Sequence, residues 1–278
     1  MSALAVASCA TVLGLDDVQY HAVLNTSDGA VDASTDQTTA AEGSTTDGAG
    51  GDALDGGFRC GQLSADAYVY CADFEGTPVY YFRGVRTGLP SPDLGNGATA
   101  VFDAAGFESP QGAAFTAPGG SNSSVTLASN EKVRHVRARF RVKTINHASW
   151  LTGAVNLVRL HLDSNQNCYV DLSVEKDPGG SNDGKLHLSC NGGNPNAFFG
   201  LPPDGEWSEM SIEVSVPSLA GTVSASVFVG GIKVQTASTG ALGGLGDHVQ
   251  LRFGIGEMGG VSAATAVMFD DVVVEELP

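Results

Sequence analysis

Apolar and polar residues alternate along most of the chain after about Phe58. Residues 136–142 place apolar side chains at the even positions and three arginines at the odd ones, and residues 207–216 and 249–255 show the same alternation. A period of two is typical of β-strands that bury one face and expose the other to solvent. No long stretch keeps the 3.6-residue period of an amphipathic helix, so we expect strands throughout this part of the chain.

Clusters of Gly, Pro, Asn and Asp separate these alternating segments, and such residues favour turns and loops. The Gly230-Gly231 pair between two apolar segments is a hairpin signal. Many short antiparallel strands joined in this way pack as two facing sheets. We therefore predict an all-β fold, a two-sheet antiparallel β-sandwich, over residues 58–278.

The distribution of charge divides the chain. Arg59 is the first basic residue, so the nine acidic residues before it give residues 1–58 a charge of −9, whereas 22 acidic and 14 basic residues give the rest −8. Residues 26–57 are rich in Ser, Thr, Asp, Gly and Ala and contain no aromatic residue, and such a composition buries too little apolar surface to fold. We predict a short apolar segment over 1–25, a disordered acidic linker over 26–57 and a folded domain over 58–278.

The net charge of −17 argues against nucleic acid as a partner, because phosphate neutralisation needs a basic surface. No apolar run reaches the roughly 18 residues of a membrane-spanning helix.

Residues 6–9 (VASC) resemble a bacterial lipobox, in which the cysteine receives a lipid and becomes the mature N-terminus. The eight residues before Cys9 carry no positive charge and are shorter than a secretory signal, so we interpret residues 1–25 as a truncated signal and lipobox or as a chance apolar segment. The resemblance implies lipidation at Cys9 and contact with the membrane through that lipid alone. With Ala10 after the cysteine, it also implies an outer-membrane or cell-surface lipoprotein.

Lipidation would leave four of the five cysteines, an even number that suits disulfide pairing. Cys168 and Cys190 each share the apolar face of an alternating segment, and both lie eleven positions from Gly179 in a turn-rich stretch. A hairpin centred there places the two cysteines opposite each other, at a separation that a disulfide can span. We predict this bridge over buried free thiols, and a second bridge between Cys60 and Cys71 at the entrance to the domain.

Three passages resemble the concanavalin A-like jelly rolls, a broad group with laminin G-like lectin domains and the carbohydrate-binding modules of bacterial glycanases. They are residues 71–76 (CADFEG), 205–234 and 269–276 (FDDVVVEE). The resemblance implies a jelly roll over about 58–278, pairing of its first and last strands, and binding of a polysaccharide or other glycan. Glycanases of this group carry a Glu-x-Asp-x-Glu strand that this chain lacks, so we favour binding over catalysis.

Candidate glycan-binding residues lie on the polar side of the predicted strands. Six of the fourteen basic residues fall within 132–143. If the strand formed by this segment lies next to the strands formed by residues 159–187, its arginines lie beside the polar residues of those strands. Arginine binds carboxylates and sulfates in a fork, and aromatic rings stack on sugars. An equally good interpretation is a cross-strand charge ladder in which these arginines pair with acidic neighbours such as Asp171, Glu209 and Glu213. The candidates are Arg139, Arg159, His161, Tyr169 and Asp171, with Trp150 as a stacking residue on a loop.

Acidic residues near the two ends of the domain suggest a metal site. If the terminal strands pair as the resemblance implies, Asp73 and Glu75 lie close to Asp270 and Asp271. Hard oxygen ligands suit Ca²⁺, and related modules carry a structural calcium, so we predict possible calcium binding here, with solvated carboxylates as the alternative.

The sequence thus favours a non-catalytic carbohydrate-binding domain on a cell-envelope lipoprotein. Two other functions stay open. One is a glycan-degrading hydrolase or lyase, and the lyase would use His161 and Tyr169 as its acid–base pair. The other is a structural or adhesion protein of the envelope without a sugar ligand.

Overall fold

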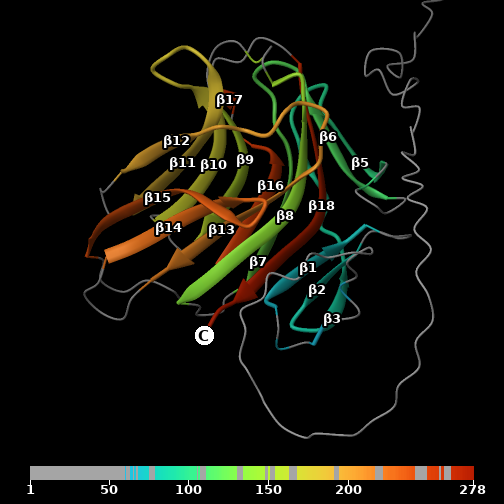
Figure 1. The fold of residues 1–278 in the computed structure, drawn as a ribbon. Helices are drawn as coiled ribbons and strands as arrows, with labels where there is room; N and C mark the ends of the chain where they lie inside the picture. The colour runs from blue at the N-terminus through green and yellow to red at the C-terminus, as the bar shows by residue number, and fades with distance from the viewer. Residues whose placement is uncertain are drawn as a thin grey trace, which may run out of the picture. The chain divides into compact units, whose positions relative to one another are not determined.

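The computed structural model describes residues 60, 63–64, 66, 68–74, 79–104, 106, 111–129, 134–147, 150, 154–162, 168–190, 194–216, 222–241, 249–256, 258–259 and 264–278. The regular elements of this part are β-strands (Figure 1), and no helix in it has the length and apolar character needed to cross a membrane. The lipobox cysteine Cys9 and the linker over 26–57 lie outside the described residues. Both therefore stay predictions.

The larger sheet has ten strands in the order β15-β14-β13-β8-β18-β1-β2-β3, with β6 also paired to β18 and β5 paired to β6. Its strands are β1 (Tyr70–Asp73), β2 (Val79–Phe82), β3 (Val85–Gly88), β5 (Thr99–Ala104), β6 (Gly112–Ala117), β8 (His135–Ile145), β13 (Ser208–Ser215), β14 (Thr222–Val229), β15 (Ile232–Ala241) and β18 (Thr265–Glu276).

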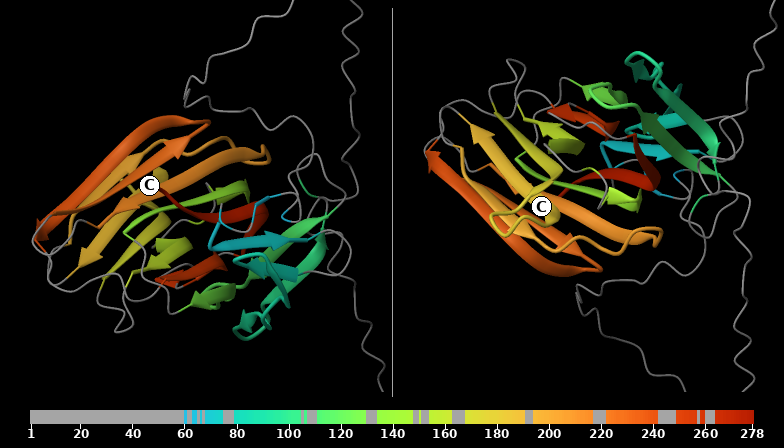
Figure 2. Two further views of the ribbon diagram at one scale, coloured as in Figure 1. Left: turned by 90° about the horizontal axis from the view of Figure 1, so that it is seen from below. Right: turned by 90° about the horizontal axis from the view of Figure 1, so that it is seen from above.

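The smaller sheet has eight strands in the order β12-β11-β10-β9-β16-β7-β4, with β17 also paired to β9. Its strands are β4 (Asp93–Leu94), β7 (Ser123–Ser129), β9 (Ala154–His161), β10 (Cys168–Lys176), β11 (Asn182–Cys190), β12 (Asn196–Phe199), β16 (Val249–Ile255) and β17 (Met258–Gly259). The described pairings in both sheets are antiparallel, and the sheets stack as two layers, seen from two sides in Figure 2. The predicted antiparallel β-sandwich is confirmed.

The core lies between the two sheets and follows from the alternation of the strands. In β8 the even positions are buried and the odd positions face outward, as the sequence predicts. Phe269 of β18 contacts the rings of Phe115, Phe140 and Phe253 at centroid distances of 6.0, 5.7 and 5.7 Å. Because Phe253 belongs to the smaller sheet and the other rings to the larger one, these aromatic contacts join the two layers.

The first and last strands of the domain pair, as the jelly-roll resemblance implies. Cys71 of β1 lies opposite Val273 of β18, and Cys71 also forms a disulfide with Cys60. Both cysteines are buried in a small cluster with Tyr68 and Val273. The predicted bridge at the entrance to the domain is therefore present.

The hairpin of β10 and β11 has the predicted register. Cys168 lies opposite Cys190, the pairing continues to Lys176 and Asn182, and the two cysteines form a disulfide. The alternative of buried free thiols is therefore wrong. The predicted hairpin at Gly230-Gly231 is also present, because Val229 of β14 pairs with Ile232 of β15.

We expect the double substitution Cys168→Ala/Cys190→Ala to lower the free energy of unfolding by about 3 kcal/mol, because the bridge restricts the unfolded chain. Urea unfolding of the oxidised chain measures this loss. The Cys60→Ala/Cys71→Ala variant is the matched comparison. Its bridge spans 11 residues instead of 22, so its loss should be smaller by about 0.6 kcal/mol. An unchanged urea midpoint in the first variant would contradict the prediction.

Candidate functional site

The candidate binding residues lie on two different faces of the sandwich, which corrects the sequence prediction of one shared face. β8 pairs with β13 and β18 in the larger sheet, whereas β9 pairs with β10 and β16 in the smaller one. β8 and β9 are consecutive along the chain, but they belong to different sheets and are therefore not neighbours. The arginines of β8 therefore point away from the side chains of β9, β10 and β11.

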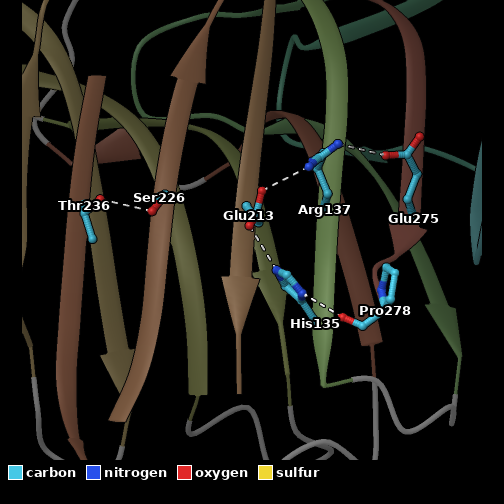
Figure 3. A network of polar contacts seen from close by, with 7 residues as sticks. All are labelled: His135, Arg137, Glu213, Ser226, Thr236, Glu275 and Pro278. Atoms are coloured by element: carbon cyan, nitrogen blue, oxygen red, sulfur yellow. Dashed lines mark hydrogen bonds and ion pairs between the residues drawn. The ribbon is translucent and has the colours of Figure 1, made fainter. Parts of the chain in front are cut away.

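The outer face of the larger sheet carries a charge ladder centred on β8. Arg137 contacts Glu213 of β13 at 3.1 Å and Glu275 of β18 at 3.8 Å, and His135 Nε2 lies 2.9 Å from Glu213 Oε1 (Figure 3). Burial opposes ionisation of Glu213, but hydrogen bonds and charge from His135 and Arg137 outweigh it and lower the pKa of Glu213. Opposite charges on adjacent strands thus stabilise one another across this face.

The ladder continues along β8. Arg139 contacts Glu275 at 3.0 Å, and Arg141 lies between Asp271 at 3.2 Å and Glu209 at 3.9 Å. For Arg139 the structure thus favours the ladder interpretation over glycan binding, since its guanidinium is engaged by a carboxylate of the next strand.

The outer face of the smaller sheet carries a row of three rings. Tyr169 of β10 lies between His161 of β9 and His187 of β11, with ring centroids 5.7 Å apart on each side. The Arg159 guanidinium carbon lies 4.6 Å from the Tyr169 ring centroid, a cation–π contact. The pairing of β9, β10 and β11 positions these side chains, because residues of one parity share a face. We call Arg159, His161, Tyr169, Asp171 and His187 the β9–β11 cluster.

Asp171 is the centre of the polar part of this cluster. Arg159 donates to it twice, from Nε to Oδ1 at 2.5 Å and from Nη2 to Oδ2 at 2.8 Å. His187 Nδ1 lies 3.6 Å from Asp171 Oδ2, and His187 Nε2 contacts Asn194 Oδ1. Asp171 is 5% exposed, so this ion pair is shielded from water. Four of the six sequence candidates are thus brought together on this face: Arg159, His161, Tyr169 and Asp171.

The pKa shifts in the cluster follow from these contacts. Burial of Asp171 opposes its ionisation, but hydrogen bonds from His187, Arg159 and Asn156 and the charge of Arg159 outweigh burial and lower the pKa of Asp171. The hydrogen bond to Asp171 raises the pKa of His187, against the effect of its own burial. The pair therefore favours an ionised aspartate and a protonated histidine.

The sequence interpretation missed Arg252 and Asn156. Arg252 of β16 lies opposite Arg159 in the register, and Asn156 of β9 hydrogen-bonds Asp171. The alternation over 249–255 does mark Arg252 as outward-facing. No local pattern, however, indicates that β16 is the neighbour of β9.

Trp150 does not have the predicted stacking role. Its side chain is 1% exposed and packs in the main core. Its backbone N–H donates to the carbonyl of His147 at 3.0 Å, and His147 in turn contacts Asp204 through Nδ1 at 2.6 Å. The indole is thus part of the core, which corrects the prediction of an exposed stacking residue.

The acidic residues of the predicted calcium site are described in part. Asp270 and Asp271 lie on β18, which pairs with β1, but Glu75 and the side chain of Asp73 lie outside the described residues. Burial and the charge of Asp270, opposed by Arg141, raise the pKa of Asp271 to about 7. Within the described part of the chain, no three His, Cys, Asp or Glu side chains gather closely enough to hold a metal ion. Calcium binding therefore stays a prediction.

Comparisons with known proteins support the fold. No protein-family model and no curated protein matches this chain. Among solved structures, the binding domain of botulinum neurotoxin serotype C1 matches with a TM-score of 0.54 at 13% identity, over 78% of this chain and 50% of that one. The likeness supports a jelly-roll β-sandwich fold.

Two further structures give the same result. The serotype D/C VPI 5993 binding domain matches with a TM-score of 0.53 at 10% identity, over 78% of this chain and 50% of that one. A structure of botulinum neurotoxin type C matches with a TM-score of 0.52 at 13% identity, over 77% of this chain and 49% of that one. Cell entry of that neurotoxin depends on interaction with two ganglioside molecules. The chain thus spans about half the length of these structures, and the likeness concerns the fold.

Proposed function

We propose that this domain binds carbohydrate without catalysis, through the β9–β11 cluster. The observation that carries the proposal is the partly exposed ring of Tyr169, which lies between the buried His161 and the partly exposed His187 on the two neighbouring strands. Aromatic rings stack on the apolar faces of pyranoses, and fixed polar groups beside them bind sugar hydroxyls. Arg159 is such a group, and its ion pair with the buried Asp171 holds it in place.

The fold is consistent with this role, because one similar structure belongs to a neurotoxin that interacts with gangliosides. The aromatic residues distinguish the two outer faces and favour the smaller sheet. Arginines are paired with carboxylates on both faces: Arg137 and Arg139 in the ladder, and Arg159 with Asp171. On the smaller sheet, the paired groups also adjoin Tyr169 and two histidine rings.

We further propose that the chain is a cell-envelope lipoprotein of the outer membrane or cell surface, anchored by a lipid on Cys9 and displayed through the acidic segment 26–57. The lipobox-like residues 6–9 support this. Metabolic labelling with an alkyne fatty acid in a bacterial host tests it, since the Cys9→Ala variant should lose the label.

A structural calcium at Asp73, Glu75, Asp270 and Asp271 is part of the proposal. A cation would offset the repulsion between the adjacent carboxylates of Asp270 and Asp271, which contributes to the raised pKa of Asp271. If calcium binds, it should raise the melting temperature and a chelator should lower it. Equal melting temperatures with calcium and with chelator would remove calcium from the proposal.

We expect the folded chain to bind a defined glycan on an array, and Tyr169→Ala to weaken that binding about two- to tenfold, because stacking contributes roughly 0.5–1.5 kcal/mol. Phe228→Ala is the matched control. Phe228 is also an aromatic residue beneath a cation, Lys233 at 5.4 Å, but it lies on the larger sheet. Its loss should leave glycan binding unchanged.

Other outcomes of this experiment decide between the remaining functions. If the folded wild-type chain binds none of the neutral and acidic glycans on the array, the proposal of carbohydrate binding is overturned and a structural or adhesion protein is favoured. Release of shortened oligosaccharides from a bound polymer would show a hydrolase or lyase instead.

A further inference from the structure

A further aromatic ring lies on the outer face of the smaller sheet, at the edge of that sheet. Phe198 belongs to β12, the outermost strand, and lies opposite Lys185 of β11 (Figure 1). The next residue, Phe199, is buried in the core, so alternation turns Phe198 to the outer side. Phe198 is partly exposed to solvent, as Tyr169 is. The outer face therefore presents a second aromatic side chain in addition to Tyr169.

The strand register places Tyr169, His187 and Phe198 in a diagonal row across β10, β11 and β12. Tyr169 lies opposite Ser189, two positions from His187. His187 lies opposite Asn196, two positions from Phe198. Both steps run in the same direction along the sheet, and a diagonal step of this kind covers about 7–8 Å. Tyr169 and Phe198 are thus about 15 Å apart along the row.

Two contacts fix the position of Phe198. Gln235 of β15 donates from Nε2 to the carbonyl oxygen of Phe198 at 3.0 Å, which ties the edge strand to the larger sheet. On the outer face, Lys185 Nζ lies 5.7 Å from the centroid of the Phe198 ring and 2.5 Å from Glu175 Oε2. A side chain that is already held in place loses little conformational entropy when a ligand packs against it.

Polar side chains accompany the row between the two rings. Asn196 is exposed, and the side chains of Lys185 and Glu175 are 17% and 27% exposed. Sugar hydroxyls both donate and accept hydrogen bonds, so an amide, an ammonium group and a carboxylate all suit them. Such contacts add to the ion pair of Lys185 and Glu175 and leave it in place.

The spacing of the two rings favours a long ligand. One pyranose cannot contact two side chains about 15 Å apart, whereas several consecutive sugars of a linear chain can. Each ring contributes a stacking contact, and the polar side chains between them meet the intervening sugars.

We infer that the site takes a stretch of several consecutive sugars of a linear polysaccharide, and that Phe198 is a second stacking position beyond Tyr169. This inference rests on the proposed carbohydrate binding and narrows it to linear polymers. The ligand then runs diagonally over β10, β11 and β12.

Pairs of oligosaccharides test the dependence on chain length with the full chain: the disaccharide and the hexasaccharide of the cellulose, xylan, chitin and polygalacturonate series. In at least one series, calorimetry should show that the hexasaccharide binds at least fivefold more tightly than the disaccharide. Equal affinities of the two lengths, or binding of none of the four series while the array detects another glycan, would overturn the inference alone. If the array also shows no binding, the proposed carbohydrate binding is overturned with it.

Variants show whether the gain with length comes from Phe198. Phe198→Leu keeps an apolar side chain without the ring, so it should lower affinity for the hexasaccharide about two- to tenfold and leave the disaccharide unaffected. Tyr169→Ala should weaken the binding of both. An unchanged hexasaccharide affinity in Phe198→Leu, or equal losses for the two lengths, would overturn the assignment.

Phe228→Leu is the matched control. Phe228 also lies beneath a lysine, Lys233 at 5.4 Å, but on the larger sheet, so both affinities should equal those of the wild type. A loss in this variant equal to that in Phe198→Leu would contradict a specific contact. Urea midpoints of all variants confirm that the fold is retained.

Discussion

Replacement of Asp171 by alanine is expected to lower the free energy of unfolding by about 3–5 kcal/mol, because it leaves a shielded guanidinium without its carboxylate. Asp171 is 5% exposed and accepts two hydrogen bonds from Arg159, at 2.5 and 2.8 Å. His187 and Asn156 add hydrogen bonds to the same side chain. Removal of this one residue therefore leaves donors on both neighbouring strands, β9 and β11, without their acceptor.

Urea unfolding at neutral pH measures this loss, and Glu213→Ala is the matched control. Glu213 also contacts two cationic side chains, His135 and Arg137, but its side chain is 26% exposed. Water screens such a pair, so the control should lose less than about 1 kcal/mol. Equal losses of unfolding free energy in the two variants would contradict the argument that the burial of Asp171 makes its ion pair more important for stability than that of Glu213.

The same aspartate should control the pH dependence of stability in two ranges, one at acidic pH through its own ionisation and one near neutrality through His187. The folded-state pKa of Asp171 is lowered, so its contribution is present above the ordinary carboxyl pKa of about 4 and disappears as pH falls through the folded pKa. The pKa of His187 is raised, so its contribution is present below its ordinary pKa of about 6.5 and disappears as pH rises through the folded pKa. Unfolding of Asp171→Asn at several pH values should show both slopes reduced.

Gly254→Ala is the second substitution with a large expected effect, a loss of about 3 kcal/mol or more. Gly254 lies within β16 with φ of +117°, a backbone conformation that side chains rarely allow. A Cβ there would lie 2.5 Å from the Ser123 carbonyl oxygen and 2.9 Å from Ser124 Cα. Both are backbone atoms of β7, which pairs with β16, so relief of the clash would disturb the sheet.

Gly200→Ala is the control for this prediction. A Cβ at Gly200 meets nothing within 4 Å, and its φ is not in the left-handed region, so stability should change by less than about 0.5 kcal/mol. The melting temperature and the yield of soluble protein measure both variants. A Gly254→Ala protein with the wild-type melting temperature would contradict the close approach of β7 and β16.

The residues of the candidate site show how far the sequence predicts function. Tyr169 and Asp171, and likewise Arg159 and His161, are two positions apart, so alternation alone places each pair on one face. The hairpin register then predicts that His187 lies opposite Asp171, as it does. Arg252 comes from a distant part of the chain and enters the site only through the pairing of β16 with β9.

The sequence by itself determined the strands, the β10–β11 hairpin and its disulfide, because these depend on the parity of neighbouring positions and on local turn residues. Only the tertiary structure decided which strands are neighbours. β8 and β9 follow each other along the chain but lie in different sheets, so the arginines of β8 form a ladder with glutamates and an aspartate while Arg159 joins the rings of the smaller sheet. The physical reason is that strand pairing and the packing of two layers depend on contacts between residues far apart in sequence, which no local pattern records.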